Sequence, residues 1–195
     1  MKRIFFSFLV ILAFSTISYA AQMQSYLNYI SQWKAVALQH QTEYQIPACI
    51  TLAQGLLESG AGSSELARNA NNHFGIKCTS DWLGDSYRHD DETRQECFRK
   101  YVDATDSYRD HALFLKRTRY ARLFDLPISD YQGWAQGLKD CGYATDPTYP
   151  QKLIRIIEDY GLDTLSASIV DGAAEKLEVP TTMEEPASTM AVPAV

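Results

Sequence analysis

The segment from Ile46 to Glu58 constrains the fold of this chain most, because almost every side of the helix that it would form is apolar. Pro47 suits the first turn of that helix, and Ser59 and Gly60 suit its end, so the predicted bounds are Ala48 to Glu58. A helix that is apolar nearly all round must be enclosed by other elements. We therefore expect a helical body around this segment. Its apolar side chains are Ile46, Cys49, Ile50, Leu52, Ala53, Leu56 and Leu57.

One narrow polar stripe follows this helix, formed by Thr51, Gln54 and Glu58 at steps of three and four residues. Glu58 closes the helix, where burial and the negative end of the helix dipole both disfavour a charged carboxylate. Both effects raise the pKa of Glu58, as a proton donor near neutral pH requires. The alternative is a glutamate in the last turn that points to water.

The rest of the chain predicts an α-dominant α+β fold. Apolar residues from Met23 to Ala37 recur at helical spacing and predict a long first helix. Further helices are expected over residues 63–70, 106–117, 129–140 and 149–160. Three short alternating runs, at residues 74–78, 86–89 and 96–101, favour strands. The expected architecture is a helical domain that carries a small antiparallel β-lobe of two or three strands.

The two ends of the chain differ from its middle. Lys2 and Arg3 precede an apolar run, and small residues end at Ala20, which predicts a secretory signal peptide over residues 1–20. The alternative is an uncleaved anchor. Residues 164–195 contain no aromatic side chain and three of the seven prolines, which predicts a disordered acidic tail rich in Pro, Thr and Ala. Residues 21–163 are then one folded domain of a secreted or periplasmic protein, without a membrane span after cleavage.

Charge and cysteine spacing narrow the range of functions. The formal net charge of −6 argues against a general nucleic-acid-binding protein. Cys78 and Cys97 lie on the first and last predicted strands, so we expect a disulfide between them, worth about 3 kcal/mol for a loop of about 20 residues. Cys49 and Cys141 either pair or remain small buried hydrophobes. The spacing of cysteines and histidines predicts no metal and no cofactor, and we expect a monomer.

Two further segments carry candidate chemistry. The acidic run His89 to Glu92 lies between predicted strands and is either a solvated hairpin tip or the source of a second carboxylate opposite Glu58. Glycoside hydrolysis uses such a pair. Asp146 and Pro147 are typical of a turn before a helix. Tyr143 and Tyr149 flank that turn and suit either a sugar-binding cleft or the core.

These segments together resemble the bacterial glucosaminidases of glycoside hydrolase family 73. The resemblance covers about Gln22 to Leu162, with the motifs in the family's order, and the cysteine-containing hairpin is most similar to secreted Bacteroides-type members. The motifs that carry it are Ile46–Gly60, Asn71–Lys77, Trp82–Gly84, Phe98–Tyr101, Ser107–His111 and Gly142–Pro147.

The resemblance implies a lysozyme-like fold and hydrolysis of the β-1,4 bond after N-acetylglucosamine in the glycan strands of peptidoglycan. It implies that Glu58 is the general acid. For the second carboxylate we favour Asp91 and then Asp90, and the hydroxyl of Tyr143 is expected to orient water or the acetamido group. The substrate-binding residues expected on this basis are Gln54, Asn72, Phe74, Trp82 and Tyr149.

Two other functions are consistent with the same residues. A lytic transglycosylase would use Glu58 without a second carboxylate and would cut after N-acetylmuramic acid. A non-catalytic wall-binding module would keep the cleft and release no fragments. The sequence leaves open whether hydrolysis is inverting, retaining or assisted by the acetamido group of the substrate. His73 and His111 are interpreted as structural histidines, and Lys77 as part of a solvated face.

Overall fold

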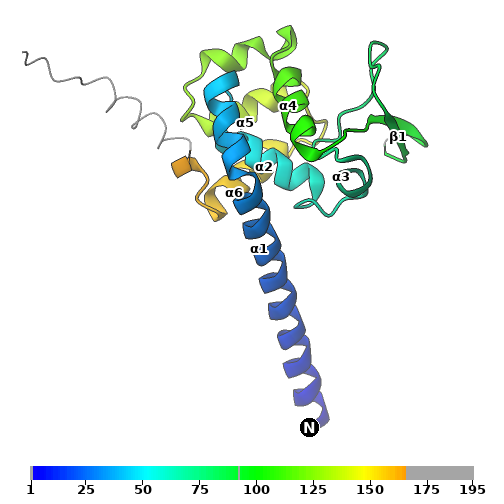
Figure 1. Cartoon of the computed structure of the whole chain (residues 1–195). Coiled ribbons are helices and arrows are strands. Elements are labelled where there is room, and N and C mark those ends of the chain that lie inside the picture. The colour runs from blue at the N-terminus through cyan, green and yellow to red at the C-terminus, as the bar shows by residue number, and fades with distance from the viewer. Residues whose placement is uncertain (1, 92, 166–195) are drawn as a thin grey trace, which may run out of the picture.

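The computed structural model describes residues 2–91 and 93–165, with side chains from residue 20 onward. Helix α1 (Lys2–Tyr44) is exposed from Ala20 to Ser25 and packs from Tyr26 onward. Its C-terminal part lies against α2 and α4 (Figure 1). The signal peptide stays a prediction, and the predicted tail falls outside the described residues from position 166 onward. No helix in the described part is both long and apolar enough to cross a bilayer.

Helix α2 (Ala48–Ser59) is the centre of the molecule, as the sequence predicted. Every residue from Ala48 to Leu56 is buried, because α1, α5 (Tyr131–Asp140) and α6 (Tyr149–Asp159) pack around it. The helix ends at Gly60, whose left-handed backbone (φ 55°) lets its N–H bond to the carbonyl of Leu56. Glycine adopts this conformation without steric cost.

The remaining helices frame this centre. Helix α3 (Glu65–Ala70) begins at a Ser64 cap, and α4 (Ala104–Leu115) begins where the Asp103 carboxylate accepts two backbone N–H groups. Helix α4 therefore starts two residues earlier than the apolar spacing predicted. The 3-10 helix η1 (Thr118–Asp125) was not predicted, because its two buried residues, Tyr120 and Leu123, are too few to show a period.

The β-lobe has two antiparallel strands, β1 (Ser86–His89) and β2 (Glu96–Arg99). Tyr87 lies opposite Phe98 in this register. The predicted strand at residues 74–78 is reduced to one bridge, between Lys77 and Phe98, so β2 lies between β1 and this segment. The predicted disulfide Cys78–Cys97 is present, with the Cα atoms 5.4 Å apart. It joins the segment to β2, which is central rather than outer.

A buried ion pair anchors the lobe to the helices. The guanidinium of Arg99 pairs with Asp110 of α4 at 2.9 Å, and the hydroxyl of Tyr101 donates to the same carboxylate at 2.6 Å. Arg99 is 6% exposed. A buried charge that lost its partner would be strongly destabilising, so these contacts hold the base of the lobe in place. The observed architecture confirms the predicted α-dominant α+β class.

Candidate active site

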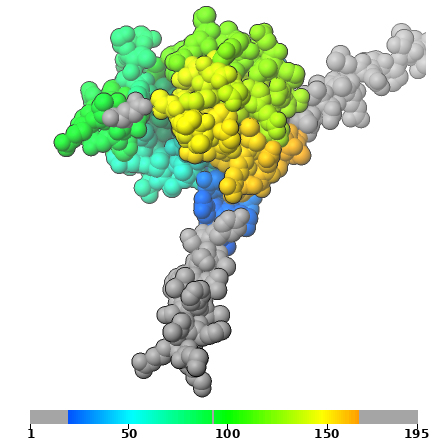
Figure 2. Space-filling model, turned by 180° about the vertical axis from the view of Figure 1, so that it is seen from behind, coloured from blue at the N-terminus to red at the C-terminus, as the bar shows by residue number. Residues whose placement is uncertain are grey.

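A cleft of about 900 Å³ lies between the β-lobe and the helical body. In Figure 2 the green hairpin and the yellow segment that leads into α6 form its two sides. The acidic hairpin that contains Asp91 and the segment from Tyr143 to Tyr149 both contribute residues to its lining, together with the end of α2. Its lining includes Glu58, Glu65, Phe74, Lys77, His89, Asp91, Phe98, Arg119, Tyr120, Tyr143, Asp146, Tyr149 and Lys152.

Glu58 stands in the last turn of α2 and lines this cleft, with part of its surface accessible from the cleft and protein atoms around most of its carboxyl group. Its Oε1 atom accepts a hydrogen bond of 3.0 Å from the hydroxyl of Tyr149. Burial of the carboxyl raises the pKa of Glu58 and the charge of Asp91 adds to this effect, while the Tyr149 bond and the charge of Lys152 oppose it. The net direction is upward, as the sequence predicted for a proton donor.

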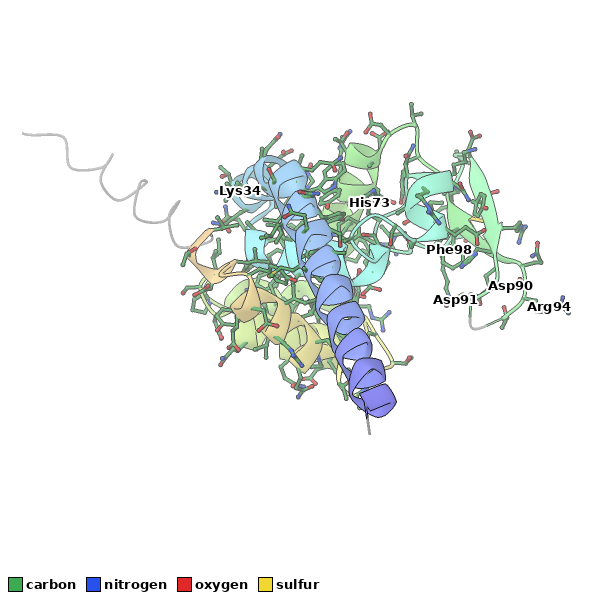
Figure 3. All side chains as sticks on the ribbon, turned by 90° about the horizontal axis from the view of Figure 1, so that it is seen from below. Lys34, His73, Asp90, Asp91, Arg94 and Phe98 are labelled. Atoms are coloured by element: carbon green, nitrogen blue, oxygen red, sulfur yellow. A yellow bond between two sulfur atoms is a disulfide. The ribbon has the colours of Figure 1, made fainter. Side chains whose placement is uncertain are left out.

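The hairpin places its two aspartates differently. The carboxylate of Asp91 lines the cleft and pairs with the ammonium group of Lys77 at 3.2 Å. Lys77 also pairs with Glu96 at 2.8 Å. Asp90 instead accepts hydrogen bonds from the backbone and side chain of Gln95, which close the hairpin turn. Figure 3 shows Asp91 on the side of the hairpin tip nearer the helical body.

The hairpin thus brings Asp91 to the cleft with Glu58 and leaves Asp90 in a turn. The remaining acidic residue of this run, at position 92, lies outside the described residues. The choice between Asp90 and Asp91 depends on the fold of the turn, because the two are adjacent in sequence and identical in type.

Tyr143 and Tyr149 stack on each other with ring centroids 5.8 Å apart. Tyr143 is half-buried on the cleft wall, and Tyr149 is buried. Burial raises the pKa of both phenols well above 10, so both stay protonated and can donate. The two tyrosines therefore belong to the core and to the cleft at the same time, which the sequence posed as alternatives.

Of the predicted substrate-binding residues Gln54 and Phe74, only Phe74 contributes to the lining of the cleft. Gln54 is fully buried, and its amide nitrogen donates to the hydroxyl of Tyr149 at 2.9 Å. Gln54 therefore contacts the residue behind Glu58 and does not face the cleft as a substrate ligand would.

Besides Gln54, two further predicted substrate-binding residues do not line this cleft. Asn72 is 1% exposed, and its side chain bonds to the backbone of Ile76 and Arg99, which ties the lobe to the body. Trp82 lines a different pocket of about 550 Å³. The indole of Trp82 donates to the carbonyl of Asp85, and the guanidinium of Arg99 lies 4.5 Å from the ring centroid. Both residues support the lobe, which their presence in family motifs did not reveal.

Sequence reasoning also underrated three residues of this region. Lys77 was interpreted as part of a solvated face, yet it pairs with Asp91. The positive charge of Lys152 lowers the pKa of Glu58. The Nε2 atom of His111 lies 3.1 Å from Oε1 of the buried Gln54. Helical spacing identifies a buried face but not the partner that each polar group finds. Among the described residues, no group of three or more His, Cys, Asp or Glu side chains is arranged to hold a metal ion.

Comparison with known proteins identifies the family of this chain. Residues 34–162 match the glucosaminidase family model, described as mannosyl-glycoprotein endo-beta-N-acetylglucosaminidase. The exo-glucosaminidase LytG of Bacillus subtilis is 36% identical over 155 residues, which cover 68% of this chain and 55% of LytG. The chain thus spans about half the length of the curated relatives it matches first.

Solved structures share the fold. The peptidoglycan hydrolase of Sphingomonas sp. A1 superposes with a TM-score of 0.62 at 26% identity and covers 80% of this chain and 99% of its own. The glycoside hydrolase domain of Salmonella typhimurium FlgJ has a TM-score of 0.59 at 26% identity, over 78% of this chain and 98% of its own. These likenesses confirm the predicted lysozyme-like fold. Because the family model matches more than half of the chain, this protein belongs to the glucosaminidase family, glycoside hydrolase family 73.

Proposed function

We propose that this protein is a peptidoglycan hydrolase that cleaves the β-1,4 bond after N-acetylglucosamine. The observation that carries the proposal is a pair of carboxylates in one cleft with different surroundings. Burial raises the pKa of Glu58, whereas the carboxylate of Asp91 is paired with an ammonium group. A carboxyl group with a raised pKa that shares a cleft with a carboxylate paired to a cation is what glycoside hydrolysis requires.

Each group has a distinct step in the proposed reaction. Glu58 donates its proton to the glycosidic oxygen as the bond from that oxygen to C1 breaks, so the departing sugar leaves as a neutral alcohol. The carboxylate of Asp91 stabilises the positive charge that develops on the remaining ring. Water then adds to C1 and releases a proton, which restores the acid form of Glu58.

The cleft walls supply the binding surface for a sugar chain. Tyr143 is half-buried on the cleft wall, and its hydroxyl is a donor for the acetamido group or the attacking water, while Phe74 packs behind the wall against His111. Tyr149 contributes through its bond to Glu58 rather than as a separate contact with the substrate.

The names of the relatives support this substrate class. LytG is an exo-glucosaminidase, and the FlgJ proteins of two Vibrio species are peptidoglycan hydrolases. The partner that we propose for this chain is therefore the glycan strand of peptidoglycan.

We also propose that the chain is exported, with residues 1–20 as its signal peptide. The Cys78–Cys97 disulfide supports a compartment that is oxidising. Protein recovered from the cell envelope should begin at Ala21 when its N-terminus is sequenced. An N-terminus at Met1 would contradict export by cleavage.

The hydrolase activity is tested by digesting purified peptidoglycan with residues 21–195. The products are reduced with borohydride, and their new ends are identified by mass spectrometry. We expect new N-acetylglucosaminitol ends. Anhydromuramic ends would instead assign the protein to the lytic transglycosylases, and binding without new ends would indicate a wall-binding module.

Glu58→Gln should abolish the release of these ends, because the amide has nearly the same shape and carries no acidic proton. Glu43→Gln is a matched control, since Glu43 is exposed on α1 and does not line the cleft. Thermal melting of both variants should match the wild type. Retained activity in Glu58→Gln would refute the assignment of the acid.

A further inference from the structure

A chain of three hydrogen bonds connects a buried histidine in α4 to the carboxyl group of Glu58. The Nε2 atom of His111 lies 3.1 Å from Oε1 of Gln54. The amide nitrogen of Gln54 donates to the hydroxyl of Tyr149 at 2.9 Å, and this hydroxyl donates to Oε1 of Glu58 at 3.0 Å. The chain thus runs from α4 through α2 to α6 and returns to the end of α2.

The groups themselves set the direction of this chain. The amide oxygen of Gln54 only accepts, so the hydrogen between it and His111 must be on Nε2 of the imidazole. This tautomer leaves Nδ1 of His111 as a bare lone pair, and Nδ1 has no hydrogen-bond partner among the described residues. The reverse direction would require a hydrogen on Nδ1, which would leave a buried N–H without an acceptor at considerable cost.

Packing keeps the chain in this arrangement. His111 and Gln54 are fully buried, and Tyr149 is 3% exposed. The imidazole stacks on Phe74 with ring centroids 3.9 Å apart, and burial lowers the pKa of His111 to about 3, so the ring is neutral. Turning the enclosed Gln54 amide over would break both of its hydrogen bonds.

Resting on the proposed role of Glu58 as the acid, we propose that Gln54 and His111 are positioning residues for its carboxyl group. Their chain keeps Oε1 of Glu58 occupied as an acceptor, so that Oε2 carries the proton toward the substrate. A neutral carboxyl group has one acceptor oxygen and one O–H, so the same donor serves Glu58 with and without its proton. No bond in the chain has to reverse during turnover.

Three variants each remove one residue of the chain: Tyr149→Phe and Gln54→Met break two of its bonds, and His111→Met breaks one. His111→Gln is the conservative variant, because its amide group keeps an N–H donor for Gln54. The matched control is His73→Asn, which removes a different buried histidine, one that contacts the hydroxyl of Tyr29 at 2.8 Å.

Two readouts distinguish positioning from a merely structural role. The titration of Glu58 is followed by its carboxyl carbon signal in NMR, without substrate. The pH profiles of kcat and KM are then measured on peptidoglycan fragments. The groups that act on the charge of Glu58 are Asp91 in the hairpin, Lys152 and Tyr149 in α6, and Tyr143 beside them. The Gln54 and His111 variants change none of these groups.

We expect Tyr149→Phe to raise the pKa of Glu58, because the bond from this hydroxyl holds that pKa down. Gln54→Met and His111→Met should shift it in the same direction and lower kcat by about tenfold, with KM little changed. His111→Gln should restore both quantities toward the wild type. His73→Asn should change neither the Glu58 titration nor kcat.

The proposal is overturned if the Gln54 and His111 variants lose thermal stability while the titration of Glu58 stays where it was. Where a variant does not fold, nitrogen NMR of the wild type identifies which ring nitrogen of His111 carries the hydrogen. A hydrogen on Nδ1 would overturn the proposal. Both measurements work without turnover. A wild type that releases no fragments would contradict the proposed hydrolase function and leave this positioning separately measurable.

Discussion

The hydroxyl of Tyr149 lies 3.0 Å from Oε1 of Glu58, although 91 positions separate the two residues in the chain. Glu58 is in the last turn of α2 and Tyr149 begins α6, so the acid lies where these two helices meet. Burial raises the pKa of Glu58, and the bond from Tyr149 limits the rise. The strength of the acid is therefore a balance between elements that are distant in sequence, and each contribution can be changed separately.

Asp91→Asn should lower kcat by about 100-fold, because it removes the carboxylate that shares the cleft with Glu58. Asp90→Asn is its matched control and should keep kcat near the wild-type value, since Asp90 bonds within the hairpin turn. The rate of release of new reducing ends from peptidoglycan measures both. If neither substitution changes the rate of release and the products carry anhydromuramic ends, a lytic transglycosylase would be favoured.

Lys152→Met should move the alkaline limb of the activity profile to higher pH. Activity needs Glu58 with its proton, so it falls as the pH rises through the pKa of this group. The positive charge of Lys152 holds that pKa down, and its loss therefore raises it. Lys34→Met is the control, because Lys34 is exposed on α1. A downward shift in Lys152→Met would show that this electrostatic account is wrong.

Replacing Cys78 and Cys97 together by serine should lower the free energy of unfolding by about 3 kcal/mol, because the bridge closes a loop in the unfolded chain. Urea unfolding of the variant and of the wild type, each with and without reductant, measures this loss. Reductant should destabilise only the wild type. Equal sensitivity of both proteins to reductant would mean that the bridge is not the cause.

Acidification should destabilise the fold through His73. Burial lowers the pKa of His73 from 6.5 to about 4, so the unfolded chain binds a proton that the folded protein does not. The stability present above pH 6.5 is lost as the pH falls toward 4, by about 3 kcal/mol for this group. His73→Asn should flatten this part of the curve of unfolding free energy against pH. An unchanged slope would assign the acid sensitivity to other groups.

Much of the helical body could be predicted from local patterns. The buried helix α2 follows from apolar residues on all of its sides, and its end follows from Gly60, a glycine that adopts the left-handed cap without steric cost. The Cys78–Cys97 bridge followed from two cysteines in the predicted lobe, although the sequence placed them on its outer strands and the structure places Cys97 on the central one. Each of these inferences uses residues within about 20 positions of one another, where the geometry of helices and hairpins restricts the outcome.

Residues whose roles depend on distant partners were predicted less well. Asn72 and Trp82 stand in motifs of the family, yet Asn72 binds the backbone of the lobe and Trp82 packs with Arg99 away from the cleft. A motif records that a residue type is needed at a position, and it does not distinguish support of the site from contact with the substrate. The role of His111 likewise could be inferred only once the structure showed that Gln54 lies within hydrogen-bond distance of it.

The sequence by itself determined the central helix, the place of Glu58 at its end and the disulfide of the lobe, because short-range spacing restricts each of them. Only the tertiary structure decided that Asp91 rather than Asp90 faces the cleft. The two aspartates are adjacent and identical in type, so they differ only in that the hairpin turn binds the carboxylate of Asp90. The tertiary structure also decided which donor reaches the acid. The contact between Glu58 and Tyr149 exists because α6 packs across the end of α2, and no local pattern encodes that packing.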